Sequence, residues 1–132
     1  MSIEKTLMEG CERLDLQLPE GAYIRLAAYL VLLERWNRAY NLTAVREPEA
    51  MVIRHLLDSL SILPWLAGPR VLDVGSGAGL PGIPLAIAQP EYEFCLLDSN
   101  GKRTRFLIQA TAELHLSNVS VVRSRAEDYR PA

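Results

Sequence analysis

The chain has 132 residues, of which 49% are hydrophobic, and a formal net charge of −2 from 14 basic and 16 acidic side chains. This composition is typical of one globular domain and excludes a disordered chain. The longest apolar run, residues 26–33, is too short to span a bilayer, and the first residues lack the pattern of a secretory signal. Cys11 and Cys95 lack the spacing of metal ligands. We therefore expect a soluble, cytoplasmic protein without a metal site or membrane segment, in which Cys95 is a buried free thiol.

Apolar periodicity in the first half predicts three helices. One face of the first helix comprises Ile3, Leu7, Cys11 and Leu14. Pro19 suits the first turn of the second helix, whose broad apolar face comprises Ile24, Leu26, Ala27, Leu30, Val31, Leu33 and Trp36. After a break at residues 41–43, Pro48 opens a third helix that Pro64 ends. Its core face comprises Met51, Ile53, Leu56, Leu57, Leu60 and Leu63.

The second half alternates strands with helices. Strands are expected at residues 70–74, 94–98 and 119–122, the first of them buried, and helices at residues 83–88 and 102–116. This alternation is typical of a parallel sheet with right-handed crossovers. We therefore predict an α/β fold of one domain, in which a helical region at residues 1–66 packs on a core at residues 67–132.

A glycine-rich loop follows the first strand and predicts a ligand site, because open α/β sheets bind ligands at the carboxyl ends of their strands. Its four glycines lie within residues 75–82, and no lysine occurs between Lys5 and Lys102, which excludes a phosphate-binding P-loop. The dinucleotide fingerprint requires a glycine where Leu80 stands. The pattern instead fits a nucleoside with an amino-acid tail packed against the backbone of Gly75, Gly77 and Gly79.

Two carboxylates support this interpretation. Asp98 ends the second strand, where a carboxylate accepts hydrogen bonds from both hydroxyls of a ribose. The alternative role is a helix N-cap, which Asn100 is able to fill instead. Asp73 either caps N–H groups of the loop or faces an ammonium group of the ligand. Residues 124–128 follow the third strand and are placed to cradle an adenine.

Charge is distributed unevenly along the chain. Residues 1–34 carry three basic and six acidic groups, whereas residues 99–132 carry six basic and three acidic groups. A basic cluster of this kind either contacts phosphates or forms a solvated surface. The basic members are Lys102, Arg103, Arg105, Arg123, Arg125 and Arg130.

Four segments of the chain resemble the RsmG (GidB) family of S-adenosylmethionine-dependent methyltransferases, which modify guanine N7 in 16S ribosomal RNA of the small ribosomal subunit. They are residues 36–43 (WNRAYNLT), 54–59 (RHLLDS), 72–84 (LDVGSGAGLPGIP) and 97–103 (LDSNGKR). The resemblance implies a Rossmann-like class I methyltransferase fold with an N-terminal helical extension. Family members continue through further strands, so it also implies that C-terminal strands are missing from this chain.

The resemblance also implies roles for individual residues. Gly75 and Leu80 match loop positions that contact the cofactor, and Ala126 and Glu127 match a segment that contacts it beyond the third strand. Arg125 matches a basic position near the reaction site and is the candidate catalytic residue.

Guanine N7 has a free lone pair, so methyl transfer to it needs no general base. Catalysis would then consist mainly of alignment, and Arg125 would grip an RNA phosphate or the guanine O6. A nicotinamide-dependent oxidoreductase, a small-molecule methyltransferase and an inactive cofactor-binding remnant are the alternative functions.

Overall fold

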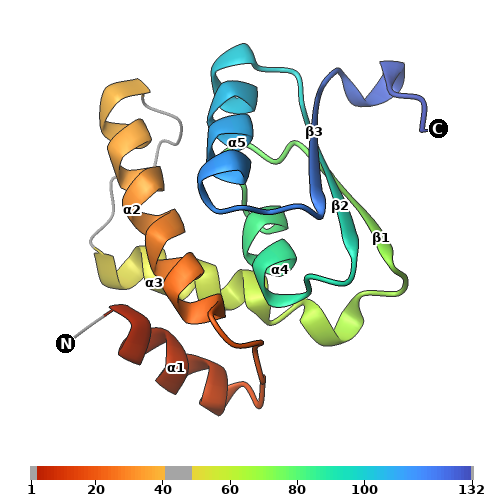
Figure 1. The fold of residues 1–132 in the computed structure, drawn as a ribbon. Helices are drawn as coiled ribbons and strands as arrows, with labels where there is room; N and C mark the ends of the chain where they lie inside the picture. The colour runs from red at the N-terminus through yellow and green to blue at the C-terminus, as the bar shows by residue number, and fades with distance from the viewer. Residues whose placement is uncertain (1–2, 41–48, 132) are drawn as a thin grey trace.

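The computed structural model describes residues 3–40 and 49–131. Helices form the first half and lie together at one side of the molecule (Figure 1). They are α1 (Ile3–Arg13), α2 (Ala22–Tyr40) and α3 (Glu49–Leu60), followed by the 3₁₀ turn η1 (Leu63–Trp65). The predicted break at residues 41–43, the predicted helix start at Pro48 and the side chain of Met51 lie outside the described residues.

The second half forms a parallel sheet with connecting helices. Its elements are β1 (Arg70–Val74), α4 (Gly82–Ala88), β2 (Glu93–Asp98), α5 (Gly101–Glu113), β3 (Val119–Arg123) and the 3₁₀ turn η2 (Ala126–Asp128). The strand order is β1-β2-β3, and both neighbouring pairs are parallel. The predicted α/β fold with a parallel sheet is confirmed.

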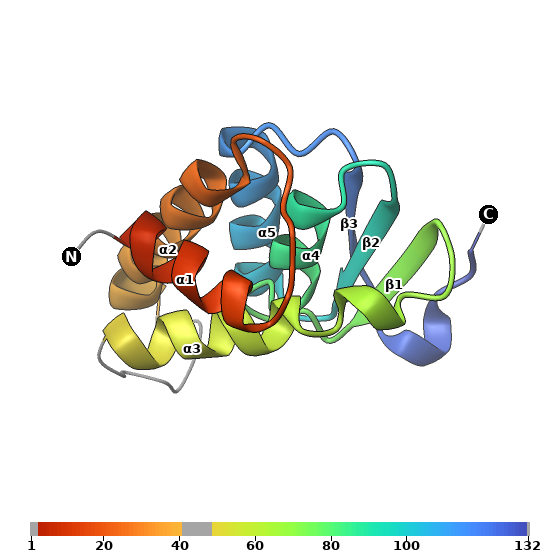
Figure 2. The same cartoon turned by 90° about the horizontal axis from the view of Figure 1, so that it is seen from below.

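The helices cover one face of the sheet in two layers (Figure 2). α4 and α5 pack on the strands, and α1, α2 and α3 lie on the outer side of α4 and α5. α4 is buried along its whole length, from Gly82 to Ala88. A helix enclosed on all sides must be apolar all round, which explains the sequence GIPLAIA in this short element.

Three predicted helix boundaries are wrong. Pro19 precedes α2, because Gly21 has a φ of +82° and cannot continue a right-handed helix. Pro64 belongs to η1, since α3 has already ended. The last helix ends at Glu113 rather than residue 116, and the positive φ of His115 (53°) reverses the chain before β3.

The buried face of α2 also differs from the prediction. Ile24 is 65% exposed and Val31 is 50% exposed, whereas Tyr29 and Leu32 are buried. Leu14, predicted on the buried face of the first helix, is 42% exposed and lies beyond the last residue of α1. The buried face of α2 is therefore set by packing against α1, α4 and α5 rather than by the largest count of aliphatic side chains.

The second face of the sheet carries no α-helix in the described part of the chain (Figure 2). β1 was expected to be buried, but Leu72 and Val74 on this face are 46% and 54% exposed. A groove of about 710 Å³ lies over the face. Cys95 lines it and is half-buried rather than buried, with its Sγ 3.7 Å from Tyr129 Oη. Both corrections have the same cause, which is that helices cover a single face.

Asn118 connects several segments by hydrogen bonds at the amino end of the sheet. Its side-chain amide donates to the carbonyl oxygens of Ala86, Gln89 and Tyr92 at 3.1, 3.3 and 2.9 Å. The backbone carbonyl of Asn118 accepts a hydrogen bond from Phe94 N at 2.8 Å. One residue before β3 therefore ties the end of α4 and the turn into β2 to the third strand.

Candidate functional site

A pocket of about 380 Å³ lies at the carboxyl ends of the three strands, the edge where open parallel sheets bind ligands. We call its first side the inner wall, which consists of Val74, Gly75, Leu97 and Asp98. We call its other side the outer wall, which consists of Ser124, Arg125, Ala126 and Glu127. Ser99 and Arg103 complete the lining.

Backbone hydrogen bonds hold the glycine loop against the end of β2. Gly75 N and Ser76 N both donate to Leu97 O, at 2.7 and 3.1 Å, and Gly77 N donates to Asp98 Oδ2 at 2.9 Å. Gly75 has a φ of +74°, and a Cβ built there meets no protein atom within 4 Å. Conformation rather than crowding therefore requires glycine at this position, and its backbone borders open space in the pocket.

Asp98 is the buried carboxylate of the inner wall, with 5% of its surface exposed. Its Oδ2 accepts from Gly77 N, and its Oδ1 accepts from Asn100 N at 2.8 Å. A carboxylate oxygen has two lone pairs, so each oxygen keeps one acceptor position besides its backbone partner. The side chain is thus held by the protein and is still able to accept two hydroxyl groups of a ligand.

Asn100, not Asp98, caps α5. Asn100 Oδ1 accepts from Lys102 N at 2.9 Å and from Arg103 N at 3.1 Å, which satisfies two of the free N–H groups at the helix start. The prediction that Asn100 fills the capping role is confirmed. Asp98 is thereby left to the loop and the pocket.

Asp73, in β1, caps an N–H group at the end of the glycine loop. Its Oδ2 accepts from Gly82 N at 3.0 Å, and Ser76 Oγ donates to its backbone carbonyl at 2.9 Å. Burial raises the pKa of the Asp73 carboxyl above its usual value, and the negative charge of Asp98 adds to the effect, while the hydrogen bond from Gly82 N acts in the opposite direction. Of the two roles considered for Asp73, the structure shows the capping of loop N–H groups.

The outer wall is an exposed segment held at its first residue. Ser124 N donates to Asp98 O at 3.1 Å, which places this segment beside the end of β2. Arg125, Ala126 and Glu127 are all exposed, and the last two belong to η2. This wall therefore offers charged side chains to a ligand, whereas the inner wall offers backbone and a buried carboxylate.

The structure brings five of the eight predicted site residues into this pocket, namely Gly75, Asp98, Arg125, Ala126 and Glu127. The other three belong to the described loop but lie outside the lining. Gly77 supports Asp98, Gly79 is buried beside Ile83, and Leu80 is half-buried against the core.

Ser99 and Arg103 also line the pocket, although neither was predicted as a site residue. The available signal was their position, since Ser99 follows Asp98 directly and Arg103 lies in the first turn of the helix that Asn100 caps. Side chains at the start of a helix after a strand border the same edge as the strand end.

Among residues 3–40 and 49–131, no helix combines the length and apolar character that crossing a bilayer requires. The same residues contain no group of three or more His, Cys, Asp or Glu side chains arranged to hold a metal ion.

Comparison with known proteins assigns most of the chain to one family model. The model, described as GidB, rRNA small subunit methyltransferase G, matches residues 23–132. Curated relatives from Ectopseudomonas mendocina and Alkalilimnicola ehrlichii are 60% identical over 127 residues and 61% identical over 125 residues. A third, from Nitrosococcus oceani, is 57% identical over 129 residues. All three relatives bear the name Ribosomal RNA small subunit methyltransferase G.

These matches cover 95%, 95% and 98% of this chain but 59%, 57% and 60% of the three relatives. The chain therefore spans a little over half the length of the curated relatives it matches.

Proposed function

The chain belongs to the rRNA small subunit methyltransferase G family, and from this premise we propose that the whole protein methylates N7 of a guanine in 16S ribosomal RNA. S-adenosylmethionine is the proposed methyl donor, and the cytoplasm is the proposed location. The observation that carries the proposal is the pocket at the carboxyl ends of the strands, in which Asp98 keeps two acceptor positions beside the glycine loop.

The pocket has features that suit this donor. Its volume of about 380 Å³ lies within the usual range for small-molecule sites. The two acceptor positions of Asp98 match the adjacent hydroxyl groups of a ribose. In this proposal Gly75 and Leu80 contact the donor, Gly77 and Gly79 give the loop its shape, and Ala126 and Glu127 border the adenine. The bound donor supplies an activated methyl group.

The protein's own contribution is alignment of the guanine. N7 attacks with its lone pair, so no residue has to remove a proton from it. Arg125 is exposed on the outer wall, where its guanidinium is available for an RNA phosphate or the guanine O6. We assign it the binding of the substrate rather than the transfer of a proton.

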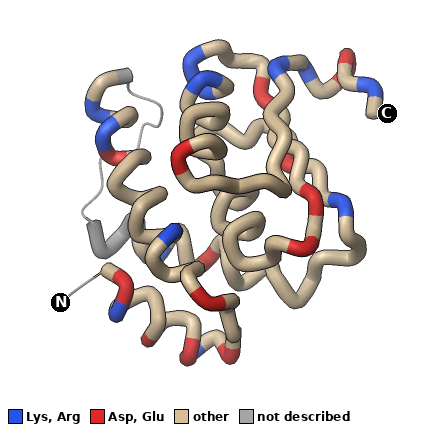
Figure 3. The backbone as a smooth tube through the Cα atoms, in the orientation of Figure 1, with Lys and Arg blue, Asp and Glu red and all other residues tan. Residues whose placement is uncertain are grey.

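Positive charge at this edge of the sheet supports an RNA substrate. Arg123, Arg125 and Arg130 belong to the segment that ends β3 and follows it, and Lys102 and Arg103 lie in the first turn of α5. All five are exposed. Figure 3 shows basic residues gathered at this end, whereas acidic residues are prominent on α1. Phosphates of an RNA would therefore be attracted to the pocket side.

Ligand binding tests the proposal first. S-adenosylhomocysteine should raise the melting temperature of the chain, because a ligand at 100 times its Kd stabilises the folded state by about 2.7 kcal/mol. NAD at the same concentration should have no effect. Stabilisation by NAD alone would contradict the assignment of the pocket.

Transfer of a tritiated methyl group from S-adenosylmethionine then tests the substrate. Label should appear in 16S ribosomal RNA or in small ribosomal subunits, at N7 of a guanine. Label in a metabolite with unlabelled RNA would favour a small-molecule methyltransferase. Binding of the donor without any transfer would favour a cofactor-binding protein.

A further inference from the structure

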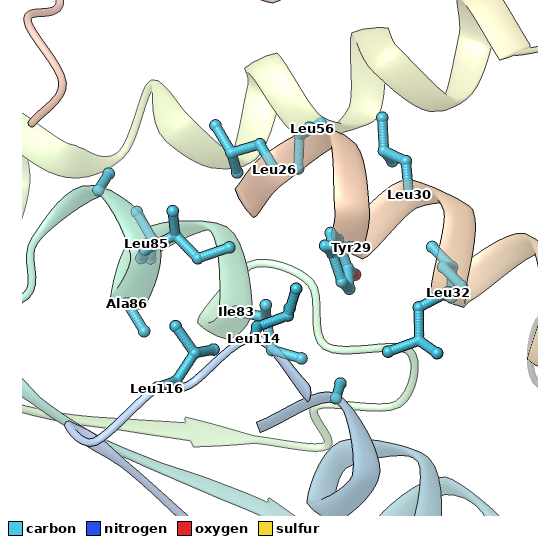
Figure 4. Close-up of a cluster of buried hydrophobic side chains, with 14 of the residues drawn as sticks. Leu26, Tyr29, Leu30, Leu32, Leu56, Ile83, Leu85, Ala86, Leu114 and Leu116 are labelled. Atoms are coloured by element: carbon cyan, nitrogen blue, oxygen red, sulfur yellow. The ribbon is translucent and has the colours of Figure 1, made fainter. Parts of the chain in front are cut away.

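Tyr29 links the N-terminal helices to the glycine loop. It lies in the middle of α2 and is fully buried. Its hydroxyl donates to Ala78 O at 2.7 Å, across 49 residues of sequence. Figure 4 shows the ring projecting from α2 between Leu26 and Leu56 on one side and Ile83 on the other. The contact therefore joins a helix outside the α/β core to the loop that follows β1.

The acceptor lies between two glycines of that loop. Ala78 stands between Gly77 and Gly79, whose φ angles are +57° and +95°. Glycine residues have access to several backbone conformations, so the peptide that joins Ala78 to Gly79 needs restraints to keep one orientation. The carbonyl of this peptide is bound by Tyr29, and its N–H donates to Ser76 O at 2.7 Å. Both ends of the peptide are thus fixed.

The chemistry of a buried phenol suits this role. Burial raises the pKa of Tyr29, and the nearby negative charge of Asp73 adds to the effect. The hydroxyl therefore remains protonated and acts as a donor. Ala78 is itself 8% exposed, so without this donor its carbonyl would be buried with no compensating hydrogen bond.

A second contact ties the same helix to α5, whose first turn borders the pocket through Arg103. The rings of Trp36 on α2 and Phe106 on α5 meet edge to face, with their centroids 5.7 Å apart. α5 begins three residues after Asp98. α2 therefore contacts both the loop and the helix that flank the inner wall.

We propose that Tyr29 is a positioning residue for the donor site, acting through Ala78 O to hold the glycine loop in its ligand-binding conformation. The identity of the ligand rests on the proposed function, whereas the restraint on the loop does not. By this inference the N-terminal helices contribute to the affinity of the pocket for its ligand without contacting the ligand.

The test compares Tyr29→Phe with Tyr23→Phe. Both changes delete one hydroxyl from α2, and the Tyr23 hydroxyl is hydrogen-bonded to Cys11 rather than to the loop. In Tyr29→Phe, the Kd for S-adenosylhomocysteine measured by calorimetry should rise about tenfold, or about 1.4 kcal/mol. Amide hydrogen exchange at Gly77 and Gly79 should accelerate by a similar factor in the ligand-free protein. Tyr23→Phe should leave both the Kd and the exchange rates within twofold of those of the unsubstituted protein. This should hold even if its melting temperature falls as much as that of Tyr29→Phe.

A Tyr29→Phe protein with unchanged Kd and unchanged loop exchange would overturn the inference but leave the proposed function standing. Failure of the unsubstituted protein to bind S-adenosylhomocysteine would overturn the proposed function, and loop exchange would still decide the inference.

If Tyr29→Phe does not fold, hydrogen exchange in the unsubstituted protein tests the inference instead. The hydroxyl proton of Tyr29 and the amide proton of Gly79 should then show protection factors that agree within about threefold, because one opening event exposes both. A Gly79 amide that is tenfold less protected than the hydroxyl proton contradicts the inference.

Discussion

The inner wall of the pocket contains a buried, hydrogen-bonded carboxylate, whereas the outer wall is exposed and charged. Asp98 on the inner wall has two backbone donors, and the loop beside it is bound to β2. On the outer wall, Arg125 and Glu127 reach into solvent. Under the proposed function, the inner wall would hold the methyl donor and the outer wall would bind the RNA.

Replacement of the inner carboxylate should have the largest effect. Asp98→Ala removes the acceptor of Gly77 N and Asn100 N as well as the proposed contacts with ribose. Hydrogen bonds to charged groups each contribute about 1.5–3 kcal/mol, so the Kd for S-adenosylhomocysteine should rise at least about 100-fold in calorimetry. The control is Asp128→Ala, an exposed carboxylate of η2 outside the lining, which should bind normally. A threefold change or less in Asp98→Ala would show that the inner wall does not hold the ligand.

Gly79→Ala should reduce stability. A Cβ at Gly79 would lie 2.6 Å from Ile83 Cδ1, and the residue has a φ of +95°. Such strain costs about 1–3 kcal/mol, which urea unfolding should detect as a lower free energy of unfolding. Gly68→Ala is the matched control, because a Cβ there meets nothing within 4 Å and its φ is not positive. Equal stability of the two variants would mean that the loop adapts freely.

Arg125→Ala tests the outer wall. Binding to a 16S ribosomal RNA fragment should weaken about tenfold, and the slope of log K against log salt should fall by about 1. The Kd for S-adenosylhomocysteine should stay within twofold. Arg13→Ala, on the exposed end of α1, should change neither. An equal loss of donor and RNA binding in Arg125→Ala would remove the distinction between the two walls.

The smallest effect is expected at Asp73 and depends on pH. Because the folded-state pKa of Asp73 is raised, the folded protein binds this proton more tightly than the unfolded chain, and stability from this group is lost as pH rises through that pKa. Asp73→Asn keeps an acceptor for Gly82 N without a charge. Its melting temperature should therefore exceed that of the unsubstituted protein at pH 7. The difference should shrink as pH falls below the pKa of Asp73, and a difference that grows on acidification would contradict the assigned shift.

Local signals predicted the strands, the loop and the cap. Alternating elements gave the parallel sheet, and the position of Asp98 at a strand end placed it at the pocket. Asn100 was identified as the alternative cap because its side chain lies just before a helix. These features depend on neighbours in sequence, so the sequence alone carries them.

Contacts between distant segments were not predictable in the same way. Nothing near Tyr29 in sequence indicates Ala78 as its partner, and the exposure of Ile24 follows from how α2 lies on other helices. Cys95 looked buried because its strand is apolar, yet its side chain faces the uncovered side of the sheet. Layer arrangement, rather than local pattern, decides these outcomes.

The Asn118 amide anchors β3 at the end of the sheet opposite the pocket. Its three carbonyl partners belong to α4, to the residue that follows α4 and to the turn into β2. At the pocket end, Ser124 N donates to Asp98 O at 3.1 Å and Arg123 Nε donates to Ser99 O at 3.4 Å. Both ends of β3 are therefore fixed, and the outer wall starts from an anchored strand.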